Sequence, residues 1–235
     1  MCDSFGVRIP VLLALLMGWT VLPAQAVDMH GETVRCPKTK YSYLLFAPEG
    51  SGPAPAVLLL HGAGEDGSGP MSAWRELAAR EKIALIAPDL PRELKFEALA
   101  PEVFRCVVDD AGRRVPIDRK RIYLFGNSMG GYLGFDGAMF DSQYFAAAAV
   151  HAADIADGYR SILGKAGRKI PLSIYIGDRD QFFPIAHVRE TANLLTKAGF
   201  PTRLIEIKGH DHNYYAVSER VNADAWEFFR QNKLP

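Results

Sequence analysis

Short apolar runs alternate with longer amphipathic stretches along most of the chain. Residues 56–60 form a continuous apolar run, which is typical of a strand buried on both faces of a sheet. The run at 83–87 has the same character and stops at Pro88. Runs of similar length predict further strands at 41–46, 121–125, 145–150, 172–176 and 204–207.

Amphipathic stretches between these runs predict helices. After Pro184, which suits a first helical turn, Ile185, Val188 and Ala192 recur at helical spacing. Gly199 then suits the end of that helix. Strands that alternate with helices favour an α/β fold, in which a mostly parallel central sheet carries helices on both faces. The other predicted helices lie near 71–81, 101–114 and 217–231, and after the glycines at 130–131.

Composition and charge narrow the class of protein. Of the 235 residues, 49% are hydrophobic and 23% are charged, which is typical of a globular protein. Lys plus Arg and Asp plus Glu each number 27, so the formal net charge is zero. A nucleic-acid-binding protein usually carries a basic excess, so no nucleic-acid partner is expected. The balanced charge also gives no basis for binding an anionic membrane surface.

The first residues have the pattern of a secretory signal. Arg8 precedes an apolar run at 11–22, and Ala24-Gln25-Ala26 follows as an A-x-A cleavage site. The run is shorter than the roughly 20 residues of a membrane-spanning helix, and no longer one follows. We therefore expect a signal peptide at 1–26, cleaved after Ala26, and a single secreted or periplasmic domain at 27–235. The alternative is a buried N-terminal helix, which the A-x-A end makes less favourable.

Cleavage after Ala26 would leave two cysteines, Cys36 and Cys106. In an exported protein such a pair can oxidise to a disulfide. Whether the two thiols can reach each other depends on a geometry that the sequence does not contain. A disulfide and two unpaired cysteines therefore both remain open.

The strand predicted at 121–125 runs directly into a candidate nucleophile. Gly126, Ser128 and Gly130 satisfy G-x-S-x-G in the strand–turn–helix context that this pattern requires. A sharp turn strains the backbone of the serine, and the two glycines leave room for it. The serine hydroxyl then lies at a helix N-terminus, where free amides favour negative charge. A plain glycine-rich turn is the alternative, so the rest of the chain must supply a base, an acid and oxyanion donors.

Each of these groups follows a predicted strand. Asp180 comes just after the strand at 172–176, and two histidines, His210 and His212, follow the strand at 204–207. The order Ser, Asp, His along the chain fits the nucleophile-elbow pattern, and all three lie at the same edge of a parallel sheet. The loop His61-Gly62-Ala63-Gly64 follows the strand at 56–60. Backbone N–H groups of Ala63 and Met129 are the expected oxyanion donors.

These motifs resemble the α/β-hydrolase superfamily over residues 41–229, and within it the small serine esterases grouped with dienelactone hydrolases and polyhydroxybutyrate depolymerases. The resemblance implies an α/β-hydrolase fold and ester hydrolysis through an acyl-enzyme, with no cofactor. Asn127 stands where those esterases often have His, and Ser128 stands where dienelactone hydrolases use Cys. The second difference argues against dienelactone hydrolysis itself.

The resemblance also implies which histidine acts as the base. In the related hydrolases the last strand ends in a form like Y-P-G-x-G-H-x-F, which places the histidine at His212 and the aromatic residue at Tyr214. His210 remains the rival base. Asp178, Asp154 and Asp157 remain rival acids, whereas Asp211 is too close to the histidines in sequence. The expected catalytic set is therefore Ser128, Asp180 and His212, with Ala63 and Met129 as the oxyanion hole.

Other candidate residues have simpler interpretations. His61 is expected to fix its own loop, and His151 to be a packed histidine rather than a pocket residue. No ligand spacing predicts a metal site. The short interval at 152–171 leaves room for one helix and no large lid, so an open cleft that admits small or polymeric esters is expected. Aromatic residues expected to line the pocket, or else to belong to the core, are Trp74, Phe182, Phe183, Tyr214 and Tyr215.

Two other functions remain open. A peptidase of the prolyl-oligopeptidase type shares the elbow and the Ser, Asp, His order, although it usually carries an added propeller domain for which 209 residues (235 minus 26) leave no room. A non-catalytic binding protein on the same scaffold is a different class. The complete set of Ser, Asp and His makes a serine esterase the favoured prediction.

Overall fold

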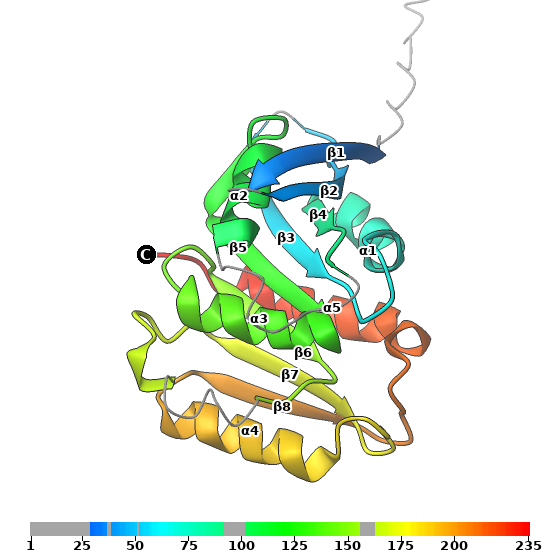
Figure 1. Cartoon of the computed structure of the whole chain (residues 1–235), viewed down its shortest axis with the longest axis vertical. Helices are drawn as coiled ribbons and strands as arrows, with labels where there is room; N and C mark the ends of the chain where they lie inside the picture. Colours follow the sequence, from blue (N-terminus) through cyan, green and yellow to red (C-terminus); the bar gives the residue numbers. More distant parts are fainter. Residues whose placement is uncertain (1–28, 37–38, 51, 92–101, 156–162) are drawn as a thin grey trace, which may run out of the picture.

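The computed structural model describes residues 29–36, 39–50, 52–91, 102–155 and 163–235, so the expected signal segment at 1–26 lies outside the described residues. A single sheet of eight strands runs through the molecule in the order β1-β2-β4-β3-β5-β6-β7-β8 (Figure 1). β1 and β2 form an antiparallel hairpin and β2 pairs antiparallel with β4, while the other neighbours are parallel. The predicted α/β fold with a mostly parallel sheet is confirmed.

The strands follow the predicted apolar runs, with one exception. The first strand, Met29–Cys36, was not predicted, because its residues lie at the sheet edge and are mostly exposed. In the central strands every residue of Ala54–Leu60 and Ala84–Pro88 is buried, as expected for a parallel sheet covered on both sides. The bounds are β1 Met29–Cys36, β2 Thr39–Phe46, β3 Ala54–Leu60, β4 Ala84–Pro88, β5 Ile117–Asn127, β6 Ala147–His151, β7 Leu172–Gly177 and β8 Thr202–Ile207.

Helices cover both faces of the sheet, and each face has its own apolar core. The buried residues of α2, α3 and α4 belong to one core, and those of α1 and α5 belong to the other. In Figure 1, α3 and α4 lie in front of the sheet and α5 lies behind it. The helices are α1 Ser68–Glu81, α2 Glu102–Ala111, α3 Met129–Phe140, α4 Ile185–Lys197 and α5 Ser218–Arg230, with short 3-10 turns at η2 Leu163–Lys165 and η3 Tyr214–Ala216.

Aromatic rings fill the core under α1 and α5. The ring of Tyr123 stacks on that of Phe229, with 4.7 Å between their centroids. Trp74 contacts Phe125 edge-on at 5.1 Å and is fully buried. Aromatic pairs of this geometry each add about 0.5–1.5 kcal/mol beyond the apolar area that they bury. Trp74 is therefore a core residue, which decides between the two roles that its sequence position allowed.

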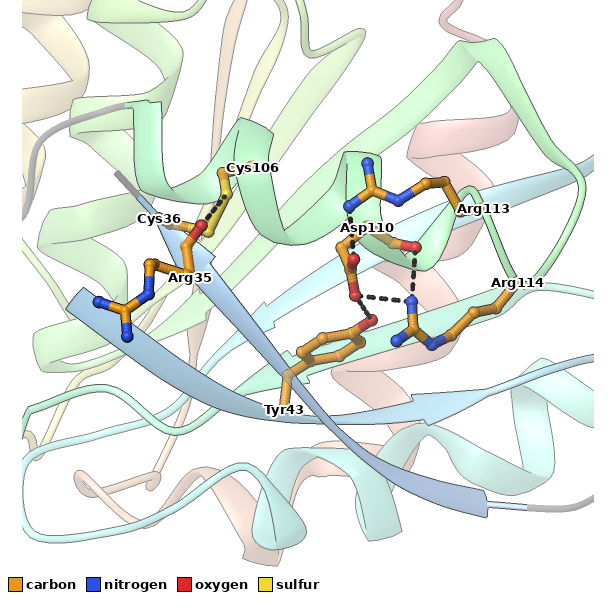
Figure 2. Close-up of a disulfide and its surroundings, with 7 residues drawn as sticks. All are labelled: Arg35, Cys36, Tyr43, Cys106, Asp110, Arg113 and Arg114. Atoms are coloured by element: carbon orange, nitrogen blue, oxygen red, sulfur yellow. Dashed lines mark hydrogen bonds and ion pairs between the residues drawn. A yellow bond between two sulfur atoms is a disulfide. The ribbon is translucent and has the colours of Figure 1, made fainter. Parts of the chain in front are cut away.

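The β1–β2 hairpin is tied to the rest of the molecule at α2. Cys36 at the end of β1 and Cys106 in α2 form a disulfide, with their Cα atoms 5.8 Å apart. Nearby, Tyr43 of β2 donates a hydrogen bond of 2.6 Å to the carboxylate of Asp110 in α2 (Figure 2). The pairing of the two cysteines, which the sequence left open, is thus a disulfide.

Two further features of the described residues concern membranes and metals. None of the helices built from them is long and apolar enough to cross a membrane. Among the same residues, no group of three or more His, Cys, Asp and Glu side chains is arranged to hold a metal ion.

Candidate active site

Ser128 occupies a strained turn between β5 and α3. Its backbone has φ 54° and ψ −116°, a region that non-glycine residues rarely adopt. A Cβ on Gly126 would collide with the carbonyl of Gly130, and one on Gly130 would collide with the carbonyl of Leu60. The N–H of Ser128 donates to the carbonyl of His151 at 2.9 Å, which holds the turn against β6. The two glycines of G-x-S-x-G are therefore required by close backbone packing, as the motif predicts.

Three predicted residues lie in one chain of hydrogen bonds. The Oγ of Ser128 is 3.0 Å from Nε2 of His212, and Nδ1 of His212 is 2.8 Å from Oδ2 of Asp180. A carboxylate can only accept, so His212 carries its proton on Nδ1 and its Nε2 accepts from the serine hydroxyl. Ser128 is partly exposed and lines a pocket.

Asp180 is held in place from both of its oxygens. Its side chain is fully buried, and Oδ1 accepts the backbone N–H groups of Phe182 and Phe183, each at 2.9 Å. Oδ2 is left for His212. A buried carboxylate that accepts three hydrogen bonds across its two oxygens is fixed in orientation, so it can also fix the plane of the imidazole ring.

The loop after β3 is held by His61 and Glu65. His61 is buried, its Nδ1 donates to the carbonyl of Gly62 at 2.8 Å, and its Nε2 accepts the N–H of Leu90 at 2.8 Å. Both ring nitrogens are thus used in fixing the loop, as expected for His61. Oε2 of Glu65 accepts the N–H of Gly62 at 3.0 Å. Ala63, the expected oxyanion donor of this loop, lines the same pocket as Ser128 and Met129.

The rival acids have other partners. Asp178 accepts the N–H of Gly209 at 2.6 Å and so joins the loop after β7 to the loop after β8. Asp211 accepts the N–H of Asn213 at 2.9 Å and holds a turn of its own loop. Asp154 accepts the hydroxyl hydrogen of Tyr132 at 3.0 Å. Asp157 lies outside the described residues.

The rival base, His210, belongs to a buried network behind the pocket. Its Nε2 lies 3.0 Å from Nε2 of His151, whose Nδ1 lies 2.9 Å from Oδ1 of Asn127. Because the amide oxygen accepts, His151 is protonated on Nδ1, and its Nε2 accepts from His210. Burial lowers the pKa of His151 to about 3 and also lowers the pKa of His210, so both rings are neutral at pH 7.

This network was not foreseen from the sequence, although His151 was expected to be packed. It links two of the loops around the site: Ser128 donates its N–H to the carbonyl of His151, and Arg179 donates its N–H to the carbonyl of His210. The only sequence signal was Asn127, the residue that differs from the common esterase elbow. Nothing in the sequence relates His151 to His210, which lie 59 positions apart.

The triad candidates line a pocket of about 720 Å³ with aromatic walls. Phe183 stacks over the ring of His212, with 5.6 Å between centroids, and contacts the ring of Tyr132 at 5.5 Å. Phe182 contacts His212 edge-on at 4.8 Å. Of the five aromatic residues that the sequence offers for the pocket or the core, four line the pocket, and Trp74 does not. The described lining residues are Gly62, Ala63, Glu65, Asn127, Ser128, Met129, Tyr132, Gln181, Phe182, Phe183, Asp211, His212, Asn213, Tyr214 and Tyr215.

Comparison with known proteins gives a family for this chain. Residues 57–186, more than half of the chain, match the model of a family described as the alpha/beta hydrolase family. No curated protein matches the chain.

Solved structures with the same architecture include hydrolases of several kinds. A thermostable esterase has a TM-score of 0.72 and 23% sequence identity, over 88% of this chain and 63% of its own. An S-formylglutathione hydrolase from Staphylococcus aureus has a TM-score of 0.69 and 17% identity, over 86% and 98%. An acylaminoacyl peptidase from Pyrococcus horikoshii has a TM-score of 0.71 and 14% identity, over 88% and 42%. The chain thus spans less than two thirds of that esterase and of that peptidase, and these likenesses show a shared fold.

Proposed function

This chain belongs to the alpha/beta hydrolase family, and we propose that it is a serine hydrolase that cleaves carboxylic esters through Ser128, His212 and Asp180. One observation carries the proposal: a partly exposed serine on a strained elbow is hydrogen-bonded to a histidine, which is hydrogen-bonded to a buried carboxylate. This arrangement activates a hydroxyl that is otherwise a weak nucleophile.

In the first half of the reaction, Oγ of Ser128 attacks the ester carbonyl while its proton passes to Nε2 of His212. The imidazole becomes a cation, and the carboxylate of Asp180 at 2.8 Å stabilises that cation without taking the proton. The N–H groups of Ala63 and Met129 are assigned to the oxyanion. When the tetrahedral intermediate collapses, the alcohol leaves with the proton from His212, and the acyl group stays on Ser128.

In the second half, water takes the place of the alcohol. His212 removes a proton from the water, which attacks the acyl carbonyl, and the same proton returns to Oγ of Ser128 as the carboxylic acid leaves. The sum is ester plus water to acid plus alcohol, with the enzyme unchanged. The chemistry uses only side chains and backbone amides of this chain, so no cofactor takes part in the proposal.

Labelling with a fluorophosphonate tests the proposal. This probe reacts with activated serines, so we expect one adduct per chain, on the peptide that contains Ser128. His212→Ala should abolish the labelling, whereas His210→Ala should retain much of it, because His210 contacts neither Ser128 nor Asp180 through a hydrogen bond in the described residues. Absence of an adduct would favour a non-catalytic binding protein, and the reverse ranking of the two histidine variants would assign the base to His210.

A peptidase is the second candidate, since an acylaminoacyl peptidase shares the fold. Both reactions proceed through an acyl-serine, so labelling does not separate them. A panel of 4-nitrophenyl esters and matched peptide 4-nitroanilides does. We expect hydrolysis of the esters, and a higher kcat/KM for a peptide anilide than for the ester with the same acyl group would assign the chain to the peptidases.

We also propose that the chain is exported and that residues 27–235 form a single domain. The signal-like segment ending at Ala26 supports this, and so does the disulfide between Cys36 and Cys106, because structural disulfides are rare in reducing compartments. The intact mass of protein recovered after export should correspond to a chain that begins at Val27. A full-length mass in the exported fraction would reject the cleavage site.

A further inference from the structure

The pocket around Ser128 has an unbalanced charge. Its described lining contains two carboxylates, Glu65 and Asp211, and neither a Lys nor an Arg. The described lining therefore carries a negative formal charge, although the whole chain is formally neutral.

Glu65 is the carboxylate that the fold holds in the pocket. Its Oε2 accepts the N–H of Gly62 at 3.0 Å and the hydroxyl hydrogen of Tyr215 at 2.9 Å. Both protein donors reach the same oxygen, so the side chain is fixed at one end while its charge is only partly neutralised. Burial, with Glu65 and Asp66 nearby, raises the pKa of Tyr215, which keeps that hydroxyl protonated as a donor. Neither donor carries a formal charge, so the carboxylate has no cationic partner in these contacts.

Exposed aromatic rings accompany this carboxylate. Tyr215 is 40% exposed and Phe182 is 66% exposed, and these are two of the four large hydrophobic side chains that the described residues leave exposed. Both line the pocket, which marks its rim as a binding surface rather than ordinary surface. The hydroxyl of Tyr215 contacts the carboxylate of Glu65, so an aromatic ring and a negative charge lie together in one pocket. Both attract an ammonium group.

We propose that this site, taken as the esterase active site proposed above, prefers esters that carry an ammonium group, with Glu65 and the ring of Tyr215 as the ammonium subsite. Neutral esters of the same shape are hydrolysed less efficiently, and esters that carry a carboxylate least efficiently, because Glu65 and Asp211 repel them.

Two series of substrates that differ in charge test the order of preference. In the acyl series, the 4-nitrophenyl esters of 4-(trimethylammonio)butanoate, 5,5-dimethylhexanoate and hydrogen glutarate differ in charge with similar chain length. In the leaving-group series, the thioesters acetylthiocholine, S-(3,3-dimethylbutyl) thioacetate and S-acetyl-3-mercaptopropionate do the same on the other side of the carbonyl. Rates are corrected for hydrolysis without enzyme. One series carries the charge on the acyl group and the other carries it on the leaving group. The subsite is therefore tested on both sides of the bond that is cleaved.

We expect kcat/KM to fall about fivefold from the cationic to the neutral ester, and about fivefold again to the anionic ester, in at least one series. Raising the ionic strength to about 1 M should shrink the ratio, because exposed charges are then screened within about 3 Å. Equal kcat/KM across both series, or a preference for the anionic esters, would overturn the proposal.

A pair of variants assigns the effect to Glu65. Glu65→Gln keeps an oxygen that can accept from Gly62 and Tyr215 but removes the charge, so the ratio of cationic to anionic kcat/KM should fall about fivefold. Glu76→Gln removes an equal charge from the exposed surface of α1, outside the pocket lining, and should leave the ratio unchanged. The same loss in both variants would mean that the overall charge of the protein, and not a subsite, sets the ratio.

This experiment separates failure of the subsite from failure of the esterase assignment. Hydrolysis of the neutral esters that depends on Ser128, without discrimination by charge, would reject the ammonium subsite and leave the proposed function intact. An absence of any hydrolysis that depends on Ser128 would reject the proposed function itself.

Discussion

Two polar clusters of the molecule differ in whether their hydrogen bonds lead to a pocket. At the carboxyl edge of β5, β7 and β8, the hydrogen bonds run from Asp180 through His212 to Ser128, and the last group lies at a pocket. At the β1–β2 hairpin, Tyr43, Arg113 and Arg114 all donate to one carboxylate, that of Asp110 (Figure 2). The first cluster ends in a serine hydroxyl at a pocket, whereas in the second three donors converge on one carboxylate.

The electrostatics of the hairpin cluster are those of a structural site. Burial by itself raises the pKa of Asp110, but the hydrogen bonds from Tyr43 and Arg113 and the charge of Arg114 outweigh it, so the pKa is lowered overall. The disulfide between Cys36 and Cys106 closes the same region covalently. We therefore expect changes in the chain of Asp180, His212 and Ser128 to alter rate more than stability, and changes at the hairpin to do the opposite.

The largest expected effect is at Ser128. Ser128→Ala removes the nucleophile and should lower kcat for ester hydrolysis by a factor on the order of 10⁴–10⁶. The serine side chain is partly exposed, so the melting temperature should change little. Steady-state kinetics and thermal unfolding on the same preparation check both halves. A variant whose kcat stays within tenfold of that of the unsubstituted enzyme would show that Ser128 is not the nucleophile.

The next effect is at Asp180. Asp180→Asn keeps the shape of the side chain but no longer stabilises an imidazolium, and it favours the wrong tautomer of His212, so kcat should fall by roughly 10³–10⁴. The two backbone amides that contact Oδ1 can still do so. The free energy of unfolding should therefore fall by less than the activation free energy rises. Urea unfolding serves as the control. A large loss of stability with a small loss of kcat would make Asp180 a structural residue.

The buried histidine pair predicts a pH dependence of stability. Burial lowers the pKa of His151 to about 3 from an ordinary value of 6.5, so between these pH values the unfolded chain binds a proton that the folded chain excludes. Stability therefore decreases as the pH falls through this window, by about 2–3 kcal/mol from pH 7.5 to 4.5 for this residue alone. Urea unfolding at the two pH values, compared with His151→Gln, isolates the contribution. The variant should lose less stability between them, and an identical loss would contradict the prediction.

At the hairpin, loss of the disulfide should change stability and leave catalysis alone. Cys36→Ser with Cys106→Ser opens a cross-link between residues 70 positions apart and should lower the free energy of unfolding by about 2–4 kcal/mol. The kcat/KM for a neutral ester should stay within about twofold at 25 °C, since β4 and β3 separate the hairpin from β5. A tenfold loss of kcat/KM in protein that is still folded would show that the two regions are coupled.

The smallest expected effect is at Tyr43, and it again separates stability from rate. Tyr43→Phe removes one buried hydrogen bond to Asp110, while Arg113 and Arg114 still contact that carboxylate. The free energy of unfolding should decrease by about 1 kcal/mol, with no change in kcat. A stabilised variant would mean that the arginines alone satisfy Asp110.

Much of the site at the carboxyl edge could be predicted, because short sequence motifs identify its residues. The elbow needs Gly126 and Gly130 next to Ser128, and close packing at both glycines explains why the motif is so strict. Parallel strands bring their carboxyl ends together, so the loops that carry Asp180 and His212 could be expected beside the elbow. The preference for His212 over His210 as the base rests on the resemblance to known esterases, because spacing alone does not separate the two.

The rest depends on contacts that have no local pattern. β1 was not predicted, because a mostly exposed edge strand lacks the apolar alternation that reveals a strand. The disulfide, the His151–His210 pair and the contact of Tyr215 with Glu65 join residues 70, 59 and 150 positions apart. Such pairs are decided by how the loops and α2 pack, which sequence patterns alone do not fix.

The most direct test of the account is to trap the acyl-enzyme. Protein mixed with 4-nitrophenyl pivalate, whose hindered acyl group is hydrolysed slowly, is quenched in acid during the first turnover and digested for mass spectrometry. We predict one pivaloyl group per chain, on the peptide that contains Ser128, and none in Ser128→Ala. Release of 4-nitrophenol by the folded enzyme without an acyl group on Ser128, or with the group on another residue, would contradict the account.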